Sequence, residues 1–129
     1  MNETPSPKAV LAGKIVSGLV GLVLLFSAGA KLSQQKAVID GFTGQFGYPA
    51  GAILPIGVVE LTCLILYVIP RTSVLGAILV TGYLGGAVAT HVRVGDVWVA
   101  PFVIGMLAWL GLFLRDARIR ALIPLRSEV

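Results

Sequence analysis

Four long apolar runs, separated by short polar segments, make up almost the whole chain. They cover about residues 9–30, 51–69, 73–90 and 97–114, and apolar side chains surround every face of each run instead of forming one stripe. Such runs are typical of membrane spans, which use roughly 20 residues each. The pattern predicts an all-α fold, an integral membrane four-helix bundle that forms a single transmembrane domain over residues 1–129.

Charged and helix-breaking residues mark the ends of these runs. Lys31 closes the first run, and Pro70 and Arg71 close the second. Because the third run begins directly afterwards, the second and third helices should form a tight hairpin. A polar and glycine-rich loop, residues 31–50, joins the first two spans, and a short polar break, residues 91–96, joins the last two.

Composition supports a membrane protein and excludes several other classes. Hydrophobic residues make up 57% of the chain and charged residues 12%, whereas soluble domains carry about 25% charged residues. The net charge of +4 does not indicate nucleic acid as a partner, because the basic residues gather at span ends and no aromatic residues interleave with them. Cys63 is the only cysteine, which excludes an intrachain disulfide, a CxxC redox pair and a cysteine-based metal cluster.

The distribution of basic residues predicts the orientation in the membrane. One side would carry Lys8, Lys14, Arg71, Arg115, Arg118, Arg120 and Arg126, and the other side Lys31, Lys36 and Arg93. Lysine and arginine are enriched in cytoplasmic segments. We therefore expect both termini in the cytoplasm, with the loop after Lys31 and the turn after His91 facing outward.

Glu60 lies at the middle of the second span. A carboxylate facing lipid at that depth costs at least about 2.5 kcal/mol, so Glu60 should point into the bundle and find a partner. Lys31, His91 and Arg93 are the candidates, at the outer end of the bundle and about 13 Å away along the helix axis. A polar clamp between helices and a role in binding or proton handling both explain such a residue.

Residues at helical spacing extend this polar centre into a predicted pocket that opens outward. Tyr67 shares a helix face with Glu60, Tyr83 shares one with His91, and Ser27 shares one with Lys31. Apolar neighbours on the same faces would make a mostly apolar cavity with a few polar groups, the usual composition of a small-molecule site.

The predicted site has two groups of residues. Glu60 and His91 are the candidate catalytic residues, which would handle protons; the candidate substrate-binding residues are Lys31, Arg93, Ser27, Tyr67, Tyr83 and Asp96. No metal is expected, because His91 is the sole histidine and its spacing from Glu60 and Asp96 matches no ligand motif.

Small residues at four-residue spacing predict where helices approach closely. They are Gly13, Ser17 and Gly21 in the first span and Gly82, Gly86 and Thr90 in the third. Membrane helices pack through such positions, because small side chains allow their backbones to come together. We expect tight helix contacts at both sets.

Several short segments together resemble the DoxX-like proteins, small four-span bacterial membrane proteins of the DoxX and DoxD group. They are residues 26–32 (FSAGAKL), 47–49 (GYP), 57–61 (GVVEL), 69–71 (IPR), 82–96 (GYLGGAVATHVRVGD) and 114–116 (LRD). The resemblance covers about residues 13–124 and implies a multi-pass protein of the bacterial cytoplasmic (inner) membrane. Lys31, Glu60, His91 and Arg93 fall on the polar pattern that recurs in such proteins.

The resemblance also suggests redox chemistry, by analogy. One branch of the group resembles a membrane subunit of thiosulfate:quinone oxidoreductase, others accompany redox or respiratory enzymes, and most members have no assigned activity. A quinone is therefore the candidate cofactor or ligand. The lone Cys63 departs from the pattern that a thiol-based electron path needs.

The leading hypothesis is a redox-associated membrane component whose outward-facing pocket binds a small lipophilic, quinone-class molecule. In it, Lys31 and Arg93 hold anionic groups while Glu60 and His91 handle protons. The alternatives are a proton-coupled small-molecule transporter, an assembly factor that contacts a partner membrane subunit or a second copy, and a stand-alone acid–base enzyme acting on a lipophilic substrate.

Overall fold

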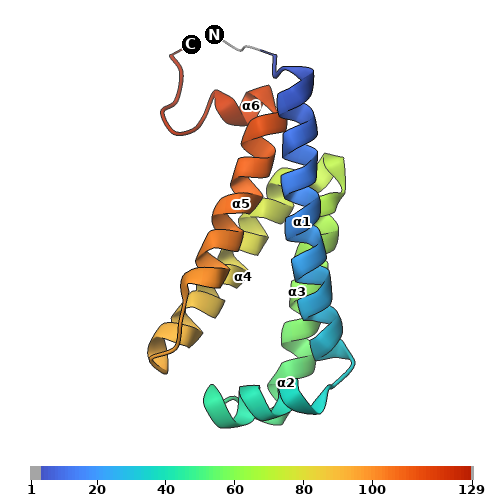
Figure 1. Cartoon of the computed structure of the whole chain (residues 1–129), viewed down its shortest axis with the longest axis vertical. Coiled ribbons are helices and arrows are strands. Elements are labelled where there is room, and N and C mark those ends of the chain that lie inside the picture. Colours follow the sequence, from blue (N-terminus) through green and yellow to red (C-terminus); the bar gives the residue numbers. More distant parts are fainter. Residues whose placement is uncertain (1–3, 129) are drawn as a thin grey trace.

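The computed structural model describes residues 4–128, and within them the chain is built from helices. The elements are α1 (Pro7–Leu32), α2 (Lys36–Asp40), η1 (Gly41–Gln45), η2 (Ala50–Ala52), α3 (Ile53–Val68), η3 (Pro70–Thr72), α4 (Ser73–Arg93), α5 (Val99–Arg115) and α6 (Ala117–Arg120). The four long helices α1, α3, α4 and α5 pack into a bundle (Figure 1). The predicted all-α bundle is confirmed.

The bundle is that of a multi-pass membrane protein. Three helical stretches, Pro7–Leu32, Ala50–Val68 and Pro70–Arg93, are long and apolar enough to cross a bilayer, and Val99–Arg115 is a shorter apolar helix. Large apolar side chains remain on the outside of the bundle, including Phe26 with 83% of its surface exposed. Lipid tails are the solvent that such a surface requires.

Each long helix contacts two neighbours. α1 packs against α3 and α5, and α4 packs against the same two helices on their other side. The start of α1 and the short α6 lie at one end of the bundle, while α2 and η1 run crosswise at the opposite end (Figure 1). We call these the α6 end and the α2 end.

Close packing fills the half of the bundle toward the α6 end. Tyr67 is completely buried, and its hydroxyl lies 2.8 Å from the Ala108 carbonyl oxygen and 2.9 Å from Ser17 Oγ. A Cβ at Gly76 would collide with the backbone of Tyr67, so α3 and α4 approach closely there. This half of the core is tightly packed, as in other protein interiors.

The two sets of small residues behave differently. Gly13 and Ser17 lie at the contact between α1 and α5, where a Cβ on Gly13 would be 2.7 Å from the Gly111 carbonyl oxygen. Gly82 and Gly86, by contrast, have no atom within 4 Å of an added Cβ. The close contact expected at the second set is therefore absent at these two glycines, which border open space instead.

Asp116 secures the turn between α5 and α6. Its carboxylate accepts hydrogen bonds from the Arg118 backbone N–H at 2.9 Å and from the Arg118 guanidinium at 2.8 Å and 3.1 Å. These bonds to Arg118 hold the pKa of Asp116 below its ordinary value of 3.8. The cap positions Ile119, which is buried against the hydrophobic core.

We expect Asp116→Ala to loosen α6 by about 1 kcal/mol, the usual cost of losing an N-cap. Because the pKa of Asp116 is lowered on folding, its contribution is complete above about pH 4 and is lost as the pH falls through the lowered value. Amide hydrogen exchange in α6, followed from pH 6 downward, measures the effect. Exchange corrected for intrinsic rates should accelerate at low pH in the wild-type protein and show no such step in Asp116→Ala.

Candidate functional site

A buried ion pair joins the last turn of α1 to the middle of α3. Lys31 Nζ donates a hydrogen bond to Glu60 Oε2 at 2.8 Å and another to Ser27 Oγ at 2.6 Å. Glu60 is 1% exposed and Lys31 is 8% exposed. Of the three candidate partners predicted for Glu60, the structure places Lys31 against it.

The residues around Lys31 and Glu60 explain why these two side chains can meet. Lys31 and Ser27 lie one helical turn apart, so both side chains project from the same face of α1. Gly57 lies on α3 one turn before Glu60, and a Cβ there would be 3.0 Å from Lys31 Cβ. The glycine therefore allows α1 and α3 to come close enough for the two charges to meet.

The attraction between Lys31 and Glu60 is strong, but burying both charges costs hydration free energy. Two charges taken out of water lose hydration energy, which their mutual attraction and extra hydrogen bonds must offset. The Ser27 hydroxyl supplies one such bond, and the short distance between Lys31 and Glu60 strengthens the attraction. These contacts hold both side chains in place between α1 and α3.

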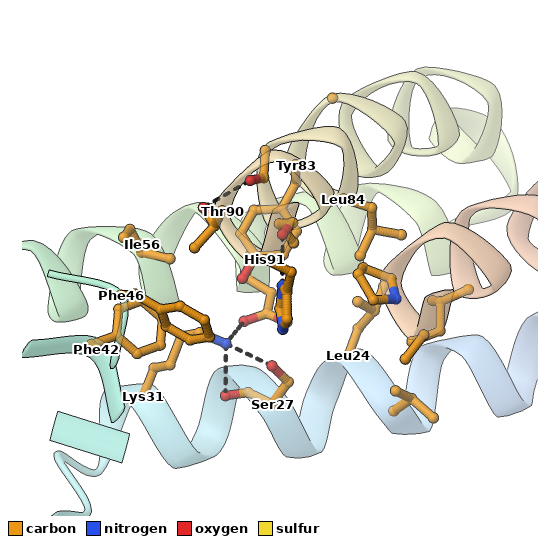
Figure 2. A pocket seen from close by; sticks show the side chains of 18 of the residues that line it. Leu24, Ser27, Lys31, Phe42, Phe46, Ile56, Tyr83, Leu84, Thr90 and His91 are labelled. Carbon is orange, nitrogen blue, oxygen red and sulfur yellow. Dashed lines mark hydrogen bonds and ion pairs between the residues drawn. The ribbon is translucent and has the colours of Figure 1, made fainter. Parts of the chain in front are cut away.

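The ion pair forms part of the wall of a cavity of about 530 Å³. All four long helices contribute to the cavity, and most of its wall is apolar. Its polar lining consists of Ser27, Lys31, Tyr48, Glu60, Tyr83, Thr90 and His91. Figure 2 labels five of them: Ser27, Lys31, Tyr83, Thr90 and His91. Both size and composition are those of a small-molecule site, with a few placed polar groups in an apolar chamber.

Gly82 and Gly86 make the α4 side of this cavity. Because neither glycine has a neighbour within 4 Å of an added Cβ, the chamber extends up to the α4 backbone. The four-residue spacing that predicted a helix contact produces a concave wall instead.

His91 presents a defined ring nitrogen at the site. Its Nδ1 lies 2.7 Å from the Ala87 carbonyl oxygen, and because a carbonyl only accepts, Nδ1 carries a hydrogen. The other ring nitrogen, Nε2, lies 3.9 Å from Asp96 Oδ2. The Phe46 ring packs against the imidazole with centroids 5.0 Å apart. The site thus offers a donor at Lys31 and an acceptor at Glu60, with the His91 ring beside them.

Aromatic residues from the crosswise segment complete the cavity. Phe42, Phe46 and Tyr48 all line it. Phe42 and Phe46 meet edge to face, with centroids 5.8 Å apart, and Lys31 Nζ lies 5.8 Å from the Phe42 ring centre. Sequence analysis assigned this stretch to a polar loop and missed all three residues. The available signal was the aromatic residues themselves, closely spaced in a segment otherwise rich in polar residues and glycine.

Two predicted site residues hold this segment and do not line the cavity. The Arg93 guanidinium donates to the Phe46 carbonyl oxygen and lies over the Tyr48 ring, 5.7 Å from its centroid. Asp96 accepts a hydrogen bond from Gln45 Nε2 at 2.8 Å. Both residues therefore tie the end of α4 to η1 and the turn after it.

Tyr67 is also outside the cavity. It lies about two turns, roughly 10 Å, from Glu60 along α3, in the packed half of the bundle beside Ser17 and Ala108. The predicted residues that the structure does bring together around the cavity are Ser27, Lys31, Glu60, Tyr83 and His91.

Among residues 4–128, no group of three or more His, Cys, Asp or Glu side chains could hold a metal ion. Cys63 is buried with its thiol free.

Comparison with known proteins identifies the family. Searches of curated proteins and of solved structures gave no match. A family model described as the DoxX-like family matches residues 15–111, which include α3, α4 and most of α1 and α5. Because the match extends over most of the sequence, the chain belongs to the DoxX-like family.

Proposed function

We propose that the cavity binds a small lipophilic molecule of the quinone class and that the protein is a redox-associated membrane component. The observation that carries this proposal is a largely apolar chamber of about 530 Å³ with the buried Lys31–Glu60 pair in its wall. A flat ring with oxygen substituents matches both features, because its faces are apolar and its edge is polar.

The polar groups of the cavity match both the quinone and the hydroquinone form of such a ring. The Lys31 ammonium donates a hydrogen bond to a ring carbonyl oxygen, and His91 Nε2 accepts one from a ring hydroxyl. A hydroquinone releases two protons when it is oxidised, and His91 and the Glu60 carboxylate are the bases at the cavity that would receive them. In this proposal the two electrons pass to a redox centre of a partner membrane subunit, which is the oxidant.

The proposed orientation has the α2 end facing outward in the bacterial cytoplasmic membrane. Basic residues near the α6 end support it, since Lys8, Arg115, Arg118 and Arg120 lie in or beside the first turn of α1 and the last turns of α5 and α6. The cavity lies toward the α2 end, where Phe42 and Phe46 contribute to it. Ligand would then reach it from the outer half of the bilayer.

Filling the cavity tests the proposal. We expect Gly82→Leu to weaken binding of a benzoquinone probe at least about tenfold, equal to about 1.4 kcal/mol, because the new side chain occupies space that is open in the wild-type protein. Binding is measured by equilibrium dialysis of radiolabelled probe against protein in detergent micelles. Gly86→Leu should behave in the same way.

Gly85→Leu is the matched control. It adds the same side chain to the same helix, also at a position with no atom within 4 Å of an added Cβ, but Gly85 is not part of the cavity wall. Its probe affinity should equal that of the wild type. Wild-type affinity in Gly82→Leu, with helical circular dichroism intact, would contradict the proposed site.

A further inference from the structure

A second hollow lies beside the cavity, on the outer face of α1. It is a groove of about 370 Å³ between α1 and the crosswise segment. Four residues line both hollows: Ser27, Lys31, Phe42 and Phe46. The groove and the cavity are therefore neighbours separated by one layer of side chains.

The groove differs from the cavity in what it faces. Its own lining residues include Phe26, Ala30, Ala37 and Val38, all of them apolar. Phe26 has 83% of its surface exposed, on a membrane helix whose outer face meets lipid. The groove is thus an apolar surface on the lipid-facing side of α1, next to the Lys31–Glu60 ion pair.

We propose that the groove is a binding site for the apolar tail of the molecule whose ring occupies the cavity. This inference rests on the proposed function and adds the class of ligand: an amphiphile with a polar ring and a long hydrocarbon or isoprenoid chain. The tail leaves the cavity past Phe42, crosses beside Lys31 and lies between α1 and α2.

The four residues that line both hollows suit a ring in the cavity and a tail in the groove. Lys31 and Ser27 are held in the ion-pair cluster, so the polar ring is retained on the cavity side. Phe42 and Phe46 project from η1 and the residue after it, are only partly buried and line both hollows, so the tail would pass beside their rings. Each methylene of the tail placed against the apolar groove adds contact area that a tail-less ring lacks.

Blocking the groove separates the tail site from the ring site. We expect Ala30→Trp to weaken binding of an isoprenoid-tailed benzoquinone about tenfold and to leave the affinity for tail-less tetramethylbenzoquinone unchanged, because Ala30 lines the groove and not the cavity. Gly29→Trp is the control, since Gly29 lines neither hollow and has open space around it. It should leave both affinities unchanged.

The outcomes distinguish this inference from the proposed function. Equal effects of Ala30→Trp on both probes, or no effect on either, would overturn the tail site while tail-less binding to the wild type still supports the cavity. Failure of the wild type to bind the tail-less probe would overturn the proposed function instead, and the tail site with it.

Photo-crosslinking gives a second readout that does not depend on a variant. A benzoquinone with a diazirine at the middle of its tail should label the peptides that contain Phe26, Ala30 and Ala37, as located by mass spectrometry. Excess unlabelled tailed quinone should suppress that labelling. Labelling spread over the outer faces of α3, α4 and α5 would overturn the assignment of the groove.

Discussion

Replacing Lys31 by Met should lower the free energy of unfolding by about 3 to 5 kcal/mol, the range measured when one partner of a buried ion pair is removed. Glu60 is 1% exposed, and its carboxylate would be left without the ammonium that lies 2.8 Å from it. Met has nearly the length of Lys, so the loss reports charge and hydrogen bonding more than packing. Glu60→Gln should be destabilising as well, because Lys31 then keeps its charge without a counter-ion.

The double variant is the informative control. Lys31→Met/Glu60→Met removes both charges and replaces them by apolar side chains of similar size, which is often neutral or stabilising in buried pairs. We expect its stability to lie within about 1 kcal/mol of the wild type. Unfolding by increasing SDS in mixed micelles, followed by circular dichroism, measures all four proteins in one series.

Ligand binding in the same series separates a clamp from a functional site. If the pair only holds α1 to α3, the double variant should bind a benzoquinone probe like the wild type. If the Lys31 ammonium and the Glu60 carboxylate contact the ligand, the double variant is stable but binds weakly. Unchanged stability in both single variants would contradict the buried pair itself, because the structure gives each charge the other as its counter-ion.

Elementary energetics predicted the inward orientation of Glu60 but not its partner. A charge at mid-membrane must face the protein, and that rule needs no structure. Which of Lys31, His91 and Arg93 pairs with Glu60 depends on the distance between α1 and α3. Gly57 allows these two helices to come close, and the sequence of either helix alone does not predict that contact. Arg93 is equally long and cationic, yet it binds the Phe46 carbonyl oxygen outside the cavity.

The crosswise segment was the hardest part to foresee. Its helices α2 and η1 are each five residues long, too short for a periodic pattern to stand out from a loop. Helices of that length gain their stability from packing on the rest of the protein and not from local propensity. The aromatic wall made by Phe42 and Phe46 is a product of that packing, so it appears only in three dimensions.

The two glycine sets show why spacing alone is ambiguous. Gly13 and Gly82 both begin a four-residue repeat of small residues, and only the first meets another helix closely. A small residue permits a close approach, but a neighbouring helix must be there to use it. At Gly82 and Gly86 no atom lies within 4 Å of an added Cβ, and both glycines border the cavity.

Gly76→Ala should lower the free energy of unfolding by about 2 to 3 kcal/mol, the upper part of the range for overpacked cores. The added Cβ would overlap the backbone of Tyr67 and of Leu66, and backbone atoms cannot move aside as a flexible side chain can. To relieve the overlap, α3 and α4 must separate. That movement pulls the Tyr67 hydroxyl away from Ala108 and Ser17, so two buried contacts weaken along with the packing.

Gly85→Ala provides the comparison within the same helix. It adds the same methyl group in open space, and alanine is favoured over glycine in a helix interior by roughly 0.5–1 kcal/mol, so we expect a neutral or slightly stabilising change. SDS unfolding of the two variants measures the difference directly. Equal stabilities would contradict the close α3–α4 contact. A selective loss in Gly76→Ala would show that the close contact between α3 and α4 at Tyr67 stabilises the bundle.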